Sequence, residues 1–507
     1  MTRSRKALVN TLCEILREVI TAVCGLILPR LILSHFGSTY NGITQSITQF
    51  ISCVSLLKSG IGSVTRAALY KPLADNDHEA ISEVVNATQH FMRKISLCFL
   101  GGVLVFAALY PILVKSYIDW FSAALLVIII SLSTFAQYYF GLTYQMVLQA
   151  DQRNYIISLV QIASVIVNTL VAAVLIQMGN GIHVVKLGSA IVYMLPPLFY
   201  FFYTRKRYHI NRQVKPNYSI ISQRWDAFGH QLANFINDNT DVMVITILLG
   251  VKEVSFYTVY YMIAHNIRVV VMAFSTGTQG AFGNMLVKGE RDNLRRRFDQ
   301  FELMMFLVTT ILYVTTAILF LPFIRLYMSG VNDYDYLSMP FAILICVAHY
   351  FECVKAPYSM LIFAKGSFKE TKTDSYIEAG INIVSSIILA RLIGINGIII
   401  GTILAAVYRV LRFNAFVSNS IIEKKPVHIL WLFTFSIICA ILSYLATSFI
   451  LPIQMDSFFV WGAYAIVVFI IVGCVTFLTS LVFFKKTTIG VLKVGLASVT
   501  TKFKKKH

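Results

Sequence analysis

Charged side chains interrupt four otherwise apolar stretches of the sequence, at residues 8–35, 42–68, 226–249 and 254–283. A charge in the hydrocarbon core of a membrane is costly, so such groups usually face the interior of a helix bundle or a water-filled cavity. The side chains concerned are Glu14, Arg17, Glu18, Lys58, Arg66, Asp238, Asp241 and Arg268. The four stretches form two adjacent pairs, one opening each half of the chain. This pattern predicts a two-lobed transporter with a charged central cavity.

Three cations among these residues fall at a similar depth. A helix rises about 1.5 Å per residue, which places Arg17, Lys58 and Arg268 near mid-membrane and Arg66 closer to the cytoplasmic mouth. Grouped cations bind multiply charged anions through charge-assisted hydrogen bonds. We therefore predict that these four residues bind a phosphate or pyrophosphate group if their helices share the cavity.

Structural roles are the alternative for some of these cations. Glu14 and Arg17 are three residues apart, a spacing that lets them pair on one helix face. Arg66 lies near an interface, where a long side chain can extend its charged end to water. Lys58 and Arg268 have no acidic neighbour within one helical turn, which favours a functional role for both.

The inner half of 226–249 is strongly polar, and Glu18 and Glu14 add carboxylates on the first span. Asp238 and Asp241 can pair with the cavity cations, bind a coupling ion or exchange protons, and pairing is the simplest interpretation. Glu352 and Lys355 are also three residues apart and are interpreted as a simple pair. The further polar candidates in 226–249 are Asn234 and Asn237.

Long apolar runs dominate the chain that must position these residues. The chain has 507 residues, of which 57% are hydrophobic, and several runs reach the roughly 20 residues needed to cross a bilayer. Continuous runs favour helices over the short alternating strands of membrane barrels. The predicted fold class is an all-α integral membrane protein with about 14 transmembrane helices. These form two six-helix lobes around a central cavity, plus two C-terminal helices.

The predicted domains follow from the long basic loop after the sixth span. Residues 1–203 form an N-lobe of helices 1–6, and 204–225 form a basic cytoplasmic linker. Residues 226–419 form a C-lobe of helices 7–12, 420–486 form helices 13 and 14, and 487–507 form a basic cytoplasmic tail.

The positive charge of the chain is concentrated on one side of the predicted spans. Lys and Arg number 43 against 24 Asp and Glu, a net charge of +19. Basic loops lie on the cytoplasmic side of membrane proteins, so both termini are expected in the cytoplasm. Positive-inside loops explain the charge, and we expect no nucleic-acid partner.

No constellation of residues typical of an enzyme is present in the sequence. It lacks phosphate-cradling Gly-rich motifs and zinc-spaced His or Cys, and all eight cysteines fall in predicted spans. The short outer loops carry no acidic or His cluster of the kind a membrane polymerase needs. We expect a protein that is not an enzyme and has no cofactor; coupling to Na⁺, H⁺ or the membrane potential is compatible with the sequence.

Three segments resemble the polysaccharide flippases of the multidrug/oligosaccharidyl-lipid/polysaccharide exporter superfamily, including the translocases of O-antigen and capsule repeat units. They are LPRLILSHFGSTYNGI (28–43), SGIGSVTRAALYKPLADND (59–77) and NTDVMVITILLGVKEVSFYTVYYMI (239–263). The resemblance implies a cavity lined mainly by helices 1, 2, 7 and 8. The cavity arginines known on helices 1, 2 and 8 of a relative have their nearest counterparts in Arg17, Lys58 and Arg268, where the lysine is a departure.

The resemblance implies a multi-pass flippase of the bacterial cytoplasmic membrane. Its expected substrate is an undecaprenyl-pyrophosphate-linked oligosaccharide, moved to the outer leaflet by alternating access for cell-surface polysaccharide synthesis. Expected partners are this substrate, membrane lipids, and a polysaccharide polymerase and glycosyltransferases. Two alternatives stay open. One is a multidrug exporter of the same fold, against which the mid-membrane cations argue, and the other is a membrane glycosyltransferase or polymerase, against which the short outer loops argue.

Overall fold

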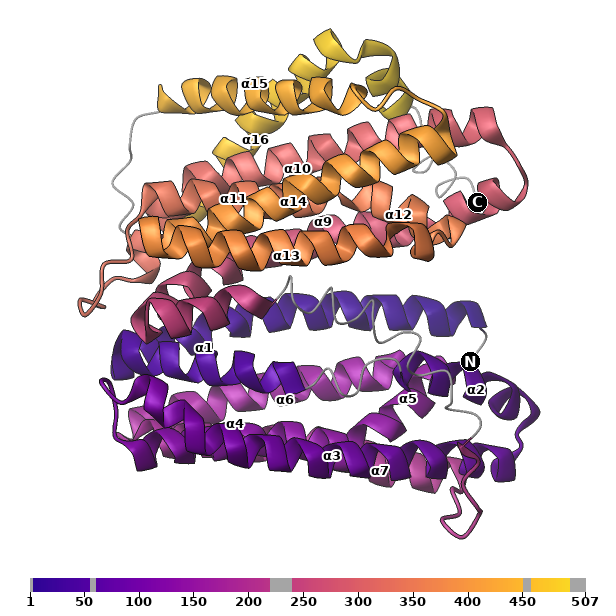
Figure 1. The fold of residues 1–507 in the computed structure, drawn as a ribbon, viewed down its shortest axis with the longest axis vertical. Coiled ribbons are helices and arrows are strands. Elements are labelled where there is room, and N and C mark those ends of the chain that lie inside the picture. The colour runs from indigo at the N-terminus through magenta and orange to yellow at the C-terminus, as the bar shows by residue number, and fades with distance from the viewer. Residues whose placement is uncertain (1–2, 55–60, 219–238, 450–456, 493–507) are drawn as a thin grey trace. The chain divides into compact units, whose positions relative to one another are not determined.

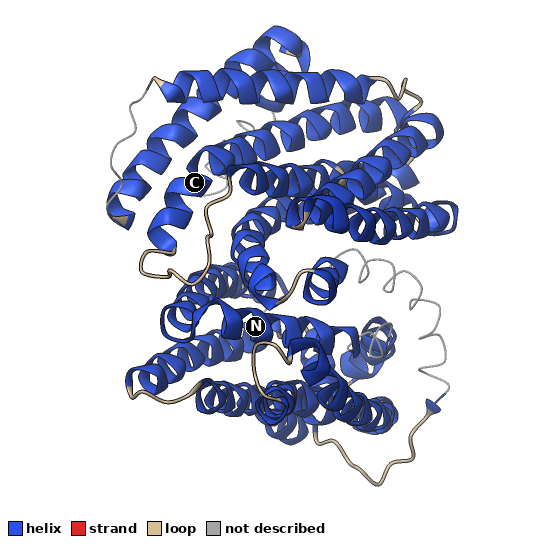
Figure 2. Cartoon of the chain, turned by 60° about the vertical axis from the view of Figure 1, so that its left-hand side comes forward, coloured by secondary structure: helices blue, strands red, loops and turns tan. Residues whose placement is uncertain are grey.

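The computed structural model describes residues 3–54, 61–218, 239–449 and 457–492 (Figure 1). The described ranges consist of helices and connecting loops and contain no strand (Figure 2). Eleven of the helices in these ranges are long and apolar enough to cross a membrane. The predicted fold class, an all-α multi-pass membrane protein, is confirmed. The total of about 14 helices stays a prediction.

The chain divides into two compact units. Unit 1 comprises Met1–Thr258 with Gly330–Tyr334, and unit 2 comprises Val259–Ser329 with Asp335–His507. Residues 239–258 therefore belong with unit 1, although the sequence analysis assigned them to the C-lobe. The predicted lobes stay a prediction, because residues 219–238, at the expected start of the C-lobe, lie outside the described residues.

Unit 1 is a bundle in which α1 packs along α6 while α4 packs between α3 and α7. A short apolar helix, Asn239–Leu248, and the first turns of α9 (Val251–Val287) complete it. The other elements are α1 (Arg3–Val54), α2 (Ile61–Asp75), α3 (His78–Val114), α4 (Trp120–Ala136), the π-helical turn η2 (Gln137–Gly141), α5 (Leu142–Ala150), α6 (Asn154–Gln177) and α7 (Ile182–Tyr208).

A break at Gly37 divides α1 into two helical segments. Gly37 has φ +76° and ψ 178°, a conformation that glycine adopts without steric cost. Asp333 closes the break by accepting hydrogen bonds from the Ser38 backbone N–H (2.7 Å) and from its Oγ (2.9 Å). The sequence analysis placed two spans at 8–35 and 42–68, and the break falls between them.

Unit 2 is a second helical bundle. In it α13 packs against α14, and α10 packs against α11, α15 and α16. Its elements, besides most of α9, are α10 (Arg291–Tyr327), α11 (Met339–Val354), α12 (Ala356–Lys365), α13 (Phe368–Ile393), α14 (Ile395–Val417), the π-helical turn η4 (Ser418–Ile422), α15 (His428–Ser448) and α16 (Phe458–Phe483).

Apolar side chains cover the outer faces of several helices. On α16 Phe459 is 87% exposed, and on α3 Leu104 is 56% exposed. Long apolar helices with large exposed apolar side chains are suited to contact with lipid rather than water. Polar groups that cluster inside a bundle are therefore the candidates for a functional site.

Candidate functional site

Unit 1 contains a partly open hollow of about 460 Å³, lined by polar and apolar side chains of α1, the α4–η2–α5 helix, α6 and α7. A second hollow of about 380 Å³ shares Arg17 and Gln145 with it and extends to Asn10 and Asn154. We call the two together the unit 1 cavity. The polar side chains of the larger hollow are Arg17, Glu18, Thr21, Ser133, Thr134, Gln137, Gln145, Gln161, Ser164, Tyr193 and Tyr200.

Arg17 is held in the wall of this cavity by three partners. Its Nη2 donates to Glu14 Oε1 (2.5 Å) and to Glu18, and its Nη1 donates to Gln161 Oε1 (2.9 Å). Glu14 Oε2 in turn accepts a hydrogen bond from Ser158 Oγ (2.9 Å). The pairing of Glu14 with Arg17 considered in the sequence analysis is therefore present, and it ties α1 to α6.

The ion cluster of Glu14, Arg17 and Glu18 carries two carboxylates and one guanidinium, hence one net negative charge. The positive charge of Arg17 is already compensated in this arrangement. An anion could bind Arg17 only if one of these pairs opened. The predicted role of Arg17 in holding pyrophosphate thus stays a prediction, and it now requires such a rearrangement.

The π-helical turn η2 aligns glutamine amides along one wall of the cavity. On a regular α-helix, Gln137 and Gln145 would point about 80° apart, because each residue turns the helix by about 100°. The wider turn of a π-helix takes up one extra residue, which brings both side chains to the same face. Gln149 follows Gln145 one turn later on α5. Both Gln137 and Gln145 line the larger hollow, and Gln145 and Gln149 line the smaller one.

Close packing between η2 and α7 fixes the position of the part of the cavity wall that α7 forms. Pro196 and Pro197 are buried within α7 and line the cavity. A Cβ atom on Gly141 would lie 2.8 Å from Cβ and 2.9 Å from Cα of Pro197, closer than real Cβ contacts. Only glycine at position 141 allows this approach.

Among the predicted cations that the structure describes, Arg66 on α2 has the fewest compensating contacts. Its Nη1 donates to Gln149 Oε1 at 3.0 Å. Among the residues that the structure describes, no carboxylate pairs with it. Arg66 was predicted to lie near the membrane interface, away from the other cations. In the structure its charge is more available to an anion than that of Arg17. It is not among the residues that line the unit 1 cavity.

Arg268 lies in unit 2, where its Nη2 is 3.7 Å from Glu352 Oε2 on α11. Arg268 has no acidic neighbour in its own helix, but it has an acidic partner on another helix. Glu352 Oε2 also lies 2.8 Å from Lys355 Nζ, so the predicted Glu352–Lys355 pair is confirmed. The prediction that these two residues pair only with each other is wrong, because Lys355 Nζ also lies 3.3 Å from Glu378 Oε1 on α13.

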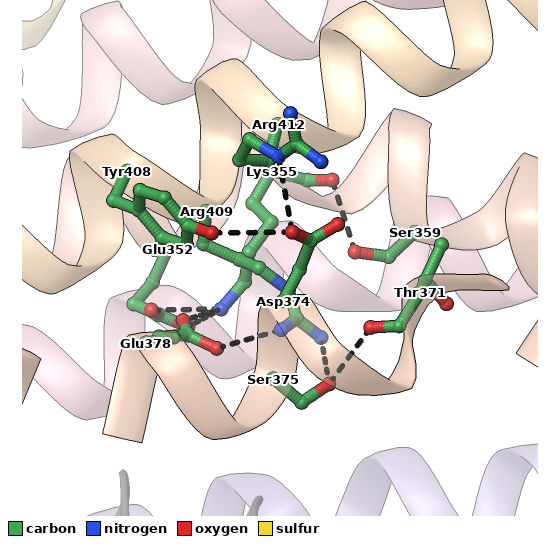
Figure 3. Close-up of polar contacts among 10 residues, drawn as sticks. All are labelled: Glu352, Lys355, Ser359, Thr371, Asp374, Ser375, Glu378, Tyr408, Arg409 and Arg412. Carbon is green, nitrogen blue, oxygen red and sulfur yellow. Dashed lines mark hydrogen bonds and ion pairs between the residues drawn. The ribbon is translucent and has the colours of Figure 1, made fainter. Parts of the chain in front are cut away.

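Glu352, Lys355 and Glu378 belong to an ionic network between α11, α13 and α14 (Figure 3). Arg409 Nη1 lies 3.3 Å from Glu378 Oε2, and Arg409 Nη2 donates to Ser375 Oγ at 2.5 Å. Nearby, Asp374 accepts hydrogen bonds from Arg412 Nε (3.0 Å) and Tyr408 (3.1 Å). Each carboxylate of the network pairs with at least one cation, as expected of ions that connect helices. With Arg268 included, the described network has four cations and three carboxylates.

The remaining predicted site residues divide into two groups. Asp241 is 6% exposed, and its Oδ2 accepts a hydrogen bond from Tyr257 (2.9 Å); it lies in unit 1 but does not line the cavity. The other group, outside the described residues, consists of Lys58, Asn234, Asn237 and Asp238.

The cavity glutamines were missed because the sequence analysis searched apolar spans for charges. The available signal was the recurrence of uncharged amides at 137, 145, 149 and 161 within two otherwise apolar spans. An amide without a hydrogen-bond partner is unfavourable in lipid, as an unpaired charge is, although its free-energy cost is lower.

No protein-family model and no curated protein matches this sequence. Among solved structures, the chain is similar to the lipid II flippase MurJ in an inward closed conformation, with a TM-score of 0.70 and 16% identity over 94% of this chain and 99% of the flippase. It is also similar to an inward-facing multidrug resistance MATE family transporter of the MOP superfamily (TM-score 0.61, 15% identity, 79% of this chain and 95% of that one). A mutant of the Vibrio cholerae MATE transporter VcmN gives a TM-score of 0.54 at 15% identity, over 83% of this chain and 99% of that one. The chain therefore has the fold that the lipid II flippase MurJ shares with the MATE transporters.

Proposed function

We propose that this chain is a flippase of the bacterial cytoplasmic membrane. It moves an undecaprenyl-pyrophosphate-linked oligosaccharide from the cytoplasmic to the outer leaflet by alternating access. Glycosyltransferases build the substrate, and a polysaccharide polymerase uses the product. The unit 1 cavity is the observation that carries the proposal, because amides and hydroxyls line most of its polar wall. Such groups replace the water around a sugar, whereas an apolar drug gains little from them.

The extent of the structural similarity supports a flippase further. Similarity to the lipid II flippase covers 94% of the chain, a share too large to leave out both α15 and α16. The two MATE transporters cover 79% and 83%, shares that can leave out both helices. In the proposed mechanism the lipid tail stays in the bilayer, and α15 and α16 present an apolar face to it.

In this proposal the pyrophosphate binds to cations that no carboxylate compensates. Arg66 fits that description among the described residues, and Lys58 is the further candidate from the sequence. Arg268, whose Nη2 lies 3.7 Å from Glu352 Oε2, could bind the pyrophosphate only if that pair opened. An inside-negative potential favours outward movement of an anion by about 2.3 kcal/mol per charge per 100 mV. The potential can therefore drive transport, and coupling to Na⁺ or H⁺ is an alternative source of energy.

A multidrug exporter is the second candidate, and the net negative charge of the Glu14–Arg17–Glu18 cluster favours it. A cationic drug would be attracted to that cluster, as an anionic group would be repelled from it. The two candidates predict different consequences of losing the protein.

Deletion of the gene in its own bacterium separates the two candidates. A flippase deletion should accumulate lipid-linked oligosaccharide on the cytoplasmic side and reduce the surface polysaccharide, with unchanged drug susceptibility. The wild-type gene should restore both, and Arg66→Ala should restore neither, while Arg66→Lys restores part. Increased sensitivity to cationic drugs with normal surface polysaccharide would instead establish the multidrug exporter.

A further inference from the structure

Two glutamine amides in the unit 1 cavity have no hydrogen-bond partner in the part of the chain that the structure describes. Gln137 and Gln145 are half-buried and point to the same face of the α4–η2–α5 helix. By contrast, Gln161 accepts from Arg17 and Gln149 accepts from Arg66. A free amide offers two donors and an acceptor with two lone pairs. Two such groups on one wall of a cavity form a hydrogen-bonding surface that a ligand can complete.

The charged residues of α1 that line the same hollow determine which ligand charge this surface tolerates. Glu18 and Arg17 line the same hollow, and the guanidinium of Arg17 is shared by Glu18 and Glu14. Together these groups leave one net negative charge in the lining of the unit 1 cavity. A ligand carboxylate would meet repulsion there, while hydroxyl and acetamido groups would meet donors and acceptors.

The volume of the cavity is sufficient for a small polar group. The larger hollow measures about 460 Å³, within the range of about 300–1,000 Å³ that is typical for small-ligand pockets. Besides the amides, Ser133, Thr134 and Ser164 add hydroxyls to its lining. The chemistry of the lining is therefore that of a site for an uncharged, hydroxyl-rich ring.

We propose that the unit 1 cavity selects an uncharged sugar of the lipid-linked oligosaccharide. Gln137 and Gln145 bind its hydroxyl or N-acetyl groups, and Glu14 and Glu18 exclude sugars that carry a carboxylate. The identity of the ligand as part of a lipid-linked oligosaccharide rests on the proposed function. The selection for an uncharged, hydrogen-bonding ligand rests on the cavity alone.

Binding to the full-length protein in lipid nanodiscs tests the selection with three probes. These are short-chain polyprenyl pyrophosphates that carry N-acetylglucosamine, glucuronic acid or no sugar. The wild-type protein should bind the N-acetylglucosamine lipid more tightly than the other two. Gln137→Leu and Gln145→Leu should each weaken that binding about fivefold, the equivalent of about 1 kcal/mol for one hydrogen bond. Neither should change the binding of the sugar-free lipid.

Gln177→Leu is the matched control, because Gln177 is exposed at the end of α6 and lies outside the cavity. Its melting temperature and affinities should match those of the wild-type protein, and the cavity variants should melt within a few degrees of it. Glu18→Gln should bring the affinity for the glucuronic acid lipid closer to that for the N-acetylglucosamine lipid. Unchanged affinities in a Gln137→Leu/Gln145→Leu double variant, or a wild-type preference for glucuronic acid, would overturn the proposal.

The two proposals fail in different ways. If the three lipids bind equally well and independently of Gln137 and Gln145, the sugar site is wrong and the flippase proposal stands. If none of the lipids binds, methyl N-acetylglucosaminide serves as the probe. Binding of this sugar that depends on both glutamines would support the sugar site while contradicting the lipid substrate, and no binding would overturn the sugar site.

Discussion

At the scale of residues, ion pairs within one helix were predictable from the sequence and ion pairs between helices were not. Spacing along one helix predicts pairs such as Glu14–Arg17 and Glu352–Lys355, and both are present. Spacing carries no information on partners from other helices, which is why the contact of Arg268 with Glu352 was missed. A charge without a neighbour in its own helix is therefore weak evidence for an open binding site.

Arg409 and Arg412 form a matched pair for testing the ionic network of unit 2. Both lie on α14 and pair with a carboxylate on α13, but the side chain of Arg409 is 8% exposed and that of Arg412 is 57% exposed. Breaking a buried pair costs about 3–5 kcal/mol, and an exposed pair contributes about 1 kcal/mol or less. We expect Arg409→Ala to lower the unfolding temperature in detergent strongly and Arg412→Ala to change it little. Equal effects would contradict the structural role of the network.

At the scale of elements, the length and order of the apolar runs predicted most of the helices. The break between the first two spans was also predictable, because Gly37 lies between two apolar runs. The π-helical turn at Gln137–Gly141 was not, since a single extra residue leaves no mark on the hydropathy of an apolar run. That turn decides which glutamines face the cavity, so the site was less predictable than the fold.

Gly141→Ala tests the packing of η2 against α7. The added methyl group would lie 2.8 Å from Pro197 Cβ, so one of the two helices has to move. Overpacking of this kind costs about 1–3 kcal/mol, and we expect a lower unfolding temperature together with weaker sugar binding. Gly101→Ala on α3 is the control, because its Cβ would meet nothing within 4 Å. The packing account fails if Gly141→Ala is as stable and active as Gly101→Ala.

Asp151 connects three elements at one end of unit 1. It lies 3.3 Å from Lys6 Nζ on α1, accepts a hydrogen bond from Tyr208 (2.6 Å) at the end of α7, and pairs with Arg153. Burial raises the pKa of Asp151, but the bonds from Tyr208 and Arg153 and the charges of Arg153 and Lys6 lower it more. The pKa therefore lies below its ordinary value.

A lowered pKa means that the Asp151 carboxylate stabilises the fold above its unfolded pKa of about 3.9, and that this contribution is lost as the pH falls through the folded value. At neutral pH we expect Asp151→Asn to unfold at a lower temperature than the wild-type protein, with a difference that shrinks below about pH 4. Asp75→Asn is the control, since Asp75 is exposed and forms no ion pair within the described residues. A difference that is independent of pH would show that the charge of Asp151 contributes nothing.

At the scale of the whole molecule, the fold follows from the sequence, whereas the substrate does not. Apolar runs and basic loops are sufficient to predict a multi-pass helical protein, and the similarity to flippase and MATE structures confirms the fold. The proposed recognition of a sugar would depend on several weak polar contacts spread over the lining of the unit 1 cavity. No short motif encodes such a site, so it has to be found from the lining of a cavity and tested by transport.

Transport in reconstituted vesicles tests the central claim most directly. A short-chain polyprenyl pyrophosphate carrying an N-acetylglucosamine-containing oligosaccharide is placed on one side, and an impermeant glycosidase measures the glycan that reaches the other. We predict that vesicles with the wild-type protein expose the glycan much faster than protein-free vesicles, and that the Gln137→Leu/Gln145→Leu double variant slows this step. Glycan movement at the protein-free rate, in vesicles that do transport a cationic drug, would contradict the account.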